Sequence, residues 1–200
     1  MVKHSKITKV FQLSLVIIFI LVLLGLFVPQ QFQNISFYLK NLLTTSVGWF
    51  YLLLVTGILI FCVFLIVSPI GQIRLGNPTS RPEHSTTSWI AMMFSAGMGI
   101  GLVFYGAAEP LSHFAISTPN AEIGSADALA DAFRFTFFHW GFHAWAVYAL
   151  VGLSLAYFGF RKREKYQLSV VFKPLFGKYA DGPIATIIDT ITIIATVIGV

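Results

Sequence analysis

The sequence predicts an all-α membrane protein, a helical transmembrane bundle, and three observations carry this prediction. Hydrophobic residues make up 56% of the chain and charged residues only 10%, whereas a soluble domain carries about 25% charged residues. Uncharged apolar runs of roughly 20 residues, the length of a membrane-spanning helix, recur along the chain. Basic residues gather in alternate connections between these runs. An ordinary soluble domain is thereby excluded, and the single Cys62 excludes a disulfide framework.

Five spans are predicted within one transmembrane domain over residues 1–200, with the bounds 10–28, 46–67, 88–108, 135–160 and 183–200. The first is an uncharged run that ends before Pro29, which cannot continue a helix. A cleavable signal peptide is the alternative, because three lysines precede the run. The run is too long for the apolar part of a signal, and no small-residue cleavage site follows it, so a span is favoured.

The remaining spans have features of their own. The second opens with Trp49 and Tyr51, aromatic residues of the kind that anchors a helix at the lipid headgroups. The third contains three glycines, and the fourth contains aromatic and histidine residues after a segment, 127–138, with the composition of an interfacial helix. The fifth begins at Pro183 and is apolar to its end. Five crossings leave no room for a separate catalytic domain.

The distribution of charge predicts the orientation, because connections rich in lysine and arginine stay in the cytoplasm. Basic residues lie before span one, between spans two and three, and after span four: Lys3, Lys6, Lys9, Arg74, Arg81, Arg161, Lys162, Arg163, Lys165, Lys173 and Lys178. The connection after span three instead carries four carboxylates against one arginine. The sequence therefore predicts a multi-pass protein of the plasma membrane with a cytoplasmic N-terminus. The net charge of +5 then needs no nucleic acid partner.

Three glycines, Gly97, Gly99 and Gly101, lie in the middle of the third span, where each costs about 1 kcal/mol relative to alanine. Close helix packing is one interpretation, because Gly97 and Gly101 form a GxxxG pair. Gly99 lies on the opposite face, and glycine on both faces favours a helix that breaks there. Freed main-chain groups are tolerated in a bilayer only where they line a cavity or bind something, as in the broken helices of secondary transporters.

The fourth span places Trp140, Trp145 and Tyr148 on one side, within about 140° of one another at about 100° per residue. Aromatic rings grouped in this way suit a quaternary ammonium group, which has no N–H to donate and binds through cation–π attraction. The alternative is interfacial anchoring by Trp140, with lipid contact or packing by the other two rings.

Two further features of the spans could carry chemistry. His139 and His143 have the spacing of two metal ligands on a helix, so a membrane-embedded metalloenzyme is a distant alternative. Five histidines are too few to complete such a site, which favours interhelical hydrogen bonds and predicts no transition metal. Asp189 is the one acidic residue inside an apolar span, which makes it a candidate for gating or an ion pathway, with a structural hydrogen bond as the alternative.

Three motifs together resemble the betaine/carnitine/choline transporter family: Ser95 to Pro110 (SAGMGIGLVFYGAAEP), His139 to Tyr148 (HWGFHAWAVY) and Ile188 to Gly199 (IDTITIIATVIG). The resemblance implies a twelve-helix fold of the leucine-transporter type, with two leading helices, two inverted repeats of five helices and assembly as a homotrimer. This chain is then expected to hold its N-terminal part, the two leading helices and the first three of repeat one. Such a fragment is expected to transport nothing alone.

The resemblance also implies roles for individual residues. The aromatic box of the family falls on Trp140, Trp145 and Tyr148, and its unwound stretch falls on five residues, Gly97, Met98, Gly99, Ile100 and Gly101. Ser95 and Met98 match contributors to one sodium site. Thr196 matches the first threonine of a second sodium site, but Val200 stands at the position of the other threonine, a departure from the family pattern.

The function that the resemblance implies is secondary active uptake of a quaternary-ammonium compatible solute for osmoprotection, coupled to Na⁺ and without a cofactor. Choline transporters of the family tend to have an acidic residue at the position of Gly101, so glycine here favours a zwitterion such as glycine betaine. Choline or carnitine transport with proton coupling or substrate exchange is the alternative. A structural or assembly subunit is a further one.

Overall fold

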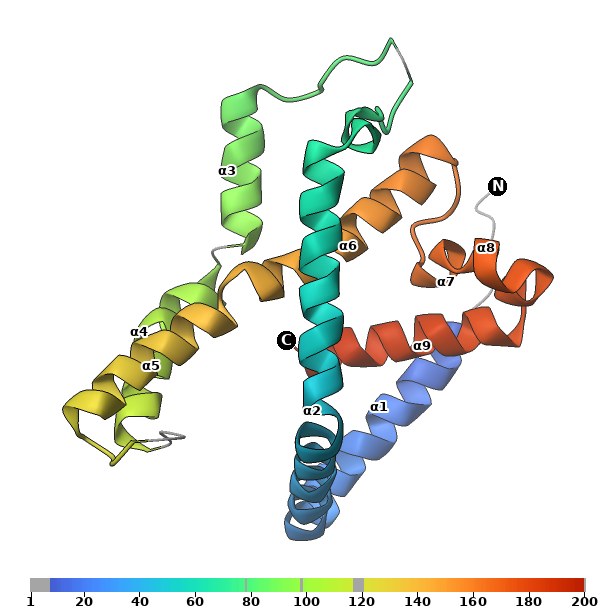
Figure 1. Cartoon of the computed structure of the whole chain (residues 1–200). Coiled ribbons are helices and arrows are strands. Elements are labelled where there is room, and N and C mark those ends of the chain that lie inside the picture. Colours follow the sequence, from blue (N-terminus) through green and yellow to red (C-terminus); the bar gives the residue numbers. More distant parts are fainter. Residues whose placement is uncertain (1–7, 78, 98, 117–120, 200) are drawn as a thin grey trace. The chain divides into compact units, whose positions relative to one another are not determined.

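The computed structural model describes residues 8–77, 79–97, 99–116 and 121–199 (Figure 1). The described residues lie in helices and in the loops that connect them, and they contain no β-strand. The chain divides into a middle unit, Val55–Leu150, and a terminal unit that combines Met1–Leu54 with Val151–Val200. Helices α2 (Pro29–Val67) and α6 (Phe142–Ala156) contribute residues to both units.

In the terminal unit, helix α1 (Lys9–Phe27) starts at a capped end and stops before a proline. The side chain of Thr8 accepts a hydrogen bond from the backbone N–H of Phe11 at 3.2 Å, as an N-cap residue does. Helix α2 then begins at Pro29 rather than at Ser46, where the second span is predicted to start. Proline ends α1 but suits the first turn of a new helix, because the N–H that it lacks would have no partner there.

Helix α9 (Pro183–Ile198) packs on α1 and on the short α7 (Leu168–Val171) (Figure 1). Between α7 and α9 in the chain lie α8 (Lys173–Phe176) and η3 (Gly177–Asp181), and η3 contacts both α8 and α9. The residues buried there are small or polar: Ser14, Ser169, Val170, Ala180, Asp189 and Thr190. Small residues let helix backbones approach closely, which is how helices pack where lipid surrounds them.

The remaining helices of the middle unit are η1 (Pro69–Gln72), α3 (Thr86–Gly97), α4 (Ile100–Ala115) and α5 (Ala126–His139). Helices α4 and α5 lie side by side (Figure 1). Ser125 caps the start of helix α5, because its side chain accepts a hydrogen bond from the backbone N–H of Ala128 at 3.1 Å. Ala128 and Ala132 are fully buried on α5, so small side chains line the contact with α4.

Three helical stretches in the described part of the chain are long and apolar enough to cross a membrane: Lys9–Phe27, Pro29–Val67 and Ala126–Arg161. The last combines α5 and α6 with the π-helical turn η2 (Tyr157–Arg161). Helix α9 is apolar but shorter, and the third predicted span, 88–108, is divided between α3 and α4. The five-span topology and the cytoplasmic N-terminus stay predictions.

Candidate functional site

The glycine-rich stretch of the third predicted span lies where one helix ends and the next begins. Helix α3 ends at Gly97 and α4 begins at Ile100. Gly99 is the N-cap residue of α4 in an extended conformation, with φ −65° and ψ −171°, and its carbonyl accepts the N–H of Val103 at 3.3 Å. The first N–H groups of α4 therefore have no acceptor within the helix. Met98, a predicted binding residue, lies outside the described residues.

A second interruption divides the fourth predicted span, 135–160, which the sequence predicts as one helix. Helix α5 ends at His139 and α6 begins at Phe142. The N–H of Trp140 closes α5 on the carbonyl of Thr136 at 3.0 Å. A Cβ at Gly141 would lie 2.6 Å from the carbonyl oxygen of Phe137, so this turn requires a residue without a side chain.

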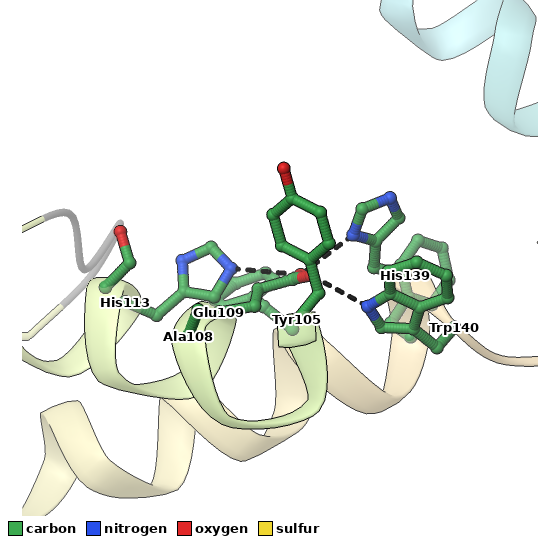
Figure 2. Close-up of a pocket in the computed structure, with 9 residues that line it drawn as sticks. Tyr105, Ala108, Glu109, His113, His139 and Trp140 are labelled. Carbon is green, nitrogen blue, oxygen red and sulfur yellow. Dashed lines mark hydrogen bonds and ion pairs between the residues drawn. The ribbon is translucent and has the colours of Figure 1, made fainter. Parts of the chain in front are cut away.

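The second interruption is contacted by Glu109, which extends from α4 toward the end of α5 (Figure 2). Its Oε2 atom accepts the indole Nε1–H of Trp140 at 2.8 Å. Its Oε1 atom lies 2.8 Å from Nδ1 of His139 and 3.5 Å from Nε2 of His113. The side chain of Glu109 is only 12% exposed, so its polar partners, rather than water, satisfy most of its hydrogen-bonding capacity.

The same residues line an open cavity of about 770 Å³ in the middle unit. Its walls combine one carboxylate with two histidines and several aromatic rings: Tyr105, Ala108, Glu109, Ser112, His113, Phe135, Phe138, His139 and Trp140. A pocket that is largely apolar with a few convergent polar groups is the usual form of a small-molecule site.

The three predicted aromatic residues lie in two separate ring pairs, one of which is completed by Tyr105. The ring of Trp140 lies beside Tyr105 of α4, with centroids 6.3 Å apart and planes inclined at 31°. Trp145 lies beside Tyr148, at 5.7 Å and 41°. The two pairs are joined at the turn, because the indole Nε1–H of Trp145 donates to the main-chain oxygen of Trp140 at 3.0 Å.

The two histidines of the fourth span have different partners. His139 meets Glu109, whereas Nε2 of His143 lies 3.2 Å from the hydroxyl of Thr56 on α2. Both contacts join two different helices, as the interpretation of this pair as interhelical hydrogen-bonding residues predicts. Within the described ranges, no group of three histidine, cysteine, aspartate or glutamate residues could hold a metal ion.

The other predicted ion residues lie on different elements. Ser95 lies on α3 and is exposed. In the terminal unit, Thr196 donates its hydroxyl to the carbonyl of Thr192 at 2.8 Å, and Asp189 accepts two hydrogen bonds from Ser169. The contacts of Asp189 are those of a structural hydrogen bond, and its gating role stays a prediction. The sodium roles of Ser95 and Thr196 stay predictions as well.

Tyr105 and Glu109 are not among the site residues predicted from the sequence. A signal for both existed, because residues four apart share one face of a helix. Trp140 on the predicted fourth span also needs a partner for its N–H when partly buried. The sequence does not say which helix supplies that partner.

Long apolar helices, two interruptions at glycine and a pocket that contains a shielded carboxylate are the features of a membrane protein with a candidate small-molecule site. Residues 9–200 of the chain match the model of a transporter family, described as betaine/carnitine/choline family transporter. The chain belongs to this family, whose members are transporters and not enzymes.

Individual relatives extend this result. The chain is 52% identical over 200 residues to glycine betaine transporter OpuD of Bacillus subtilis (strain 168), covering 100% of this chain and 39% of that protein. A probable glycine betaine transporter of Desulfitobacterium hafniense (strain Y51) is 43% identical over 196 residues, 98% of this chain and 39% of that protein. The ectoine/hydroxyectoine transporter of Virgibacillus pantothenticus is 42% identical over 192 residues, 96% of this chain and 38% of that protein. The chain thus spans about two fifths of the length of these relatives.

Proposed function

We propose that the protein takes up a zwitterionic quaternary-ammonium solute, glycine betaine in the first place, by sodium-coupled secondary transport across the plasma membrane for osmoprotection. The observation that carries the proposal is the contact between Tyr105 and Trp140, which joins the helix after the glycine interruption to the predicted aromatic box. The relatives named glycine betaine transporters support the choice of substrate.

In this proposal the two ends of the substrate have different partners. A trimethylammonium group has no N–H, so the faces of aromatic rings replace hydrogen-bond acceptors, and Trp140, Trp145 and Tyr148 supply them. The carboxylate is held by free backbone N–H groups at the start of α4, around Ile100 and Gly101. Helix N-termini also carry partial positive charge, which favours an anion there.

The coupling ion needs oxygen ligands, and the main-chain carbonyls of Ser95 and Met98 are the proposed contributors in this chain. The hydroxyl of Thr196 is the proposed contributor to a second sodium site. In this proposal the remaining ligands of the first site come from the second repeat of the family fold, whereas Val200 stands where the second site has its other threonine. Assembly as a homotrimer on the twelve-helix inverted-repeat plan is part of the same proposal.

Residue 101 favours a zwitterion over choline. A substrate with a lone positive charge gains from a carboxylate beside it in low dielectric, and Gly101 supplies none. A substrate that brings its own carboxylate does not need one. Ectoine, the substrate in the name of one relative, is also a zwitterion and is the second candidate.

The test is uptake of radiolabelled glycine betaine into proteoliposomes that contain the complete gene product. The proposal predicts accumulation with an inward sodium gradient and none with an equal potassium gradient. Unlabelled betaine is expected to compete, and choline is expected to compete poorly. Uptake that follows a proton gradient and ignores sodium would contradict the coupling, and competition by ectoine alone would favour the second candidate.

A further inference from the structure

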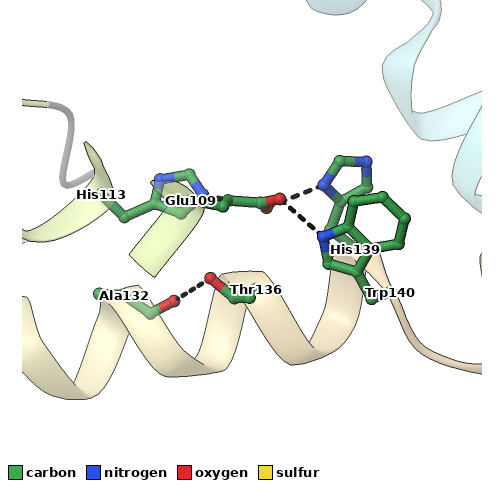
Figure 3. A network of polar contacts seen from close by, with 6 residues as sticks. All are labelled: Glu109, His113, Ala132, Thr136, His139 and Trp140. Atoms are coloured by element: carbon green, nitrogen blue, oxygen red, sulfur yellow. Dashed lines mark hydrogen bonds and ion pairs between the residues drawn. The ribbon is translucent and has the colours of Figure 1, made fainter. Parts of the chain in front are cut away.

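The indole of Trp140 is held at its edge by a carboxylate from the neighbouring helix (Figure 3). A hydrogen bond to an ionised acceptor is about twice as strong as one between neutral groups, and 2.8 Å is a typical length for it. Because Glu109 is only 12% exposed, water competes weakly for this bond. The position of Glu109 therefore sets the direction of the Trp140 ring.

Two more residues, Tyr105 and Trp145, contact Trp140 directly. Tyr105, one turn before Glu109 on α4, lies beside the indole ring at 6.3 Å. The main-chain oxygen of Trp140 accepts the indole N–H of Trp145 at 3.0 Å. The other carboxylate oxygen of Glu109 is occupied by His139, which limits rotation of the carboxylate. Helix α4 thus fixes both the edge and the plane of the ring.

Donation to a carboxylate also changes the ring electronically. Hydrogen bonds in a low-dielectric site polarise the groups that form them, so an indole N–H bound to an anion leaves its ring richer in electrons. Cation–π attraction is electrostatic and grows with the negative charge of the ring face. The bond from Trp140 to Glu109 therefore strengthens the attraction of this ring for a cation as well as fixing its direction.

We propose that Glu109 is a positioning residue for substrate recognition, which acts through Trp140 by orienting its indole and enriching its face. This inference rests on the proposed function, in which Trp140 contacts the quaternary ammonium group. It assigns a substrate-affinity role to a carboxylate on a different helix from the aromatic box. His139 and His113 are the supporting contacts that hold the carboxylate in place.

Variants of Glu109 in the complete transporter give the first test. Glu109→Ala is expected to raise the KM for betaine about tenfold, the equivalent of one lost charge-assisted bond, while Vmax stays within about twofold. Glu109→Gln keeps a carbonyl acceptor on a side chain of the same length and is expected to recover part of the affinity. The matched control is Glu122→Gln, an exposed carboxylate in the connection before α5, with an unchanged KM expected. An unchanged KM in Glu109→Ala overturns the proposal.

A double variant separates action through Trp140 from direct contact with the substrate. Trp140→Phe keeps an aromatic face and removes the N–H that Glu109 accepts. In this background, Glu109→Ala is expected to add less than about twofold to the KM, because the shared bond is already gone. The same tenfold rise in both backgrounds would mean that Glu109 attracts the substrate directly, and it overturns the positioning role.

The ¹⁹F resonance of Trp140 tests the positioning role without a transport assay, which is useful for variants that reach the membrane poorly. With 5-fluorotryptophan in the complete protein, the ¹⁹F resonance of Trp140 is assigned by its loss in Trp140→Phe. Glu109→Ala is expected to shift or broaden this resonance, and Glu122→Gln is expected to leave it in place. A resonance that Glu109→Ala does not move overturns the positioning role, whereas absence of betaine uptake by the wild-type protein contradicts the proposed function. The two failures are therefore distinguishable.

Discussion

Ser169 binds both carboxylate oxygens of Asp189, its backbone N–H at 3.0 Å and its hydroxyl at 2.9 Å. Both residues are buried, Ser169 with 2% and Asp189 with 8% of its surface exposed. The carboxylate of Asp189 on α9 thus caps the first turn of α7, where a backbone N–H has no partner within the helix. This arrangement ties the segment after α6 to α9.

Removal of this contact is expected to lower stability. Asp189→Ala leaves the N–H and hydroxyl of Ser169 buried without a partner, which costs about 1 to 3 kcal/mol. Asp189→Asn keeps one acceptor oxygen and is expected to cost less. Thermal unfolding of the detergent-solubilised protein measures both. A gating role instead predicts that Asp189→Asn abolishes uptake while the unfolding temperature stays at the wild-type value.

The turn at Gly141 is expected to be intolerant of a side chain. Gly141→Ala places a methyl group against the carbonyl of Phe137, and relief of this overlap must move α5 or α6, at a cost of about 1 to 3 kcal/mol. The matched control is Gly152→Ala on α6, where a Cβ would meet nothing within 4 Å. The unfolding temperature is expected to fall for the first variant and not for the second. Equal temperatures would show that the turn does not need glycine.

Local features of this chain were predictable from sequence, because they depend on neighbouring residues. Glycines at 97, 99 and 101 disfavour a continuous helix, and α3 and α4 meet within that stretch. The start of α2 was missed, because the residues after Pro29 are polar and hydropathy marks only the apolar part of a helix. The contact of Glu109 with Trp140 was also missed, since it depends on how α4 packs against α5.

The orientation predicted from charge can be measured with single cysteines. Cys62, the cysteine within these 200 residues, is first replaced by alanine. A small effect is expected, because its sulfur makes only a weak contact, 3.7 Å from the carbonyl oxygen of Ala146. A cysteine at Lys162 is expected to react with a membrane-impermeant maleimide only from the cytoplasmic side. A cysteine at Glu122 is expected to react only from outside. The reverse pattern would place the N-terminus outside.

In the proposed function, aromatic rings beside the α5/α6 turn bind the quaternary ammonium group, and a variant of Trp145 shows whether they do. Trp145→Leu removes an aromatic face and also the indole N–H that closes the turn on Trp140. Trp49→Leu is the matched control, because Trp49 is an exposed indole in the terminal unit.

The measurement is the equilibrium Kd for glycine betaine, obtained by calorimetry on the complete, purified transporter in saturating sodium. We expect Trp145→Leu to raise the Kd tenfold or more, since a desolvated cation–π contact contributes about 2 kcal/mol, and Trp49→Leu to leave it unchanged. A Kd for Trp145→Leu equal to that of the wild-type protein would contradict the claim.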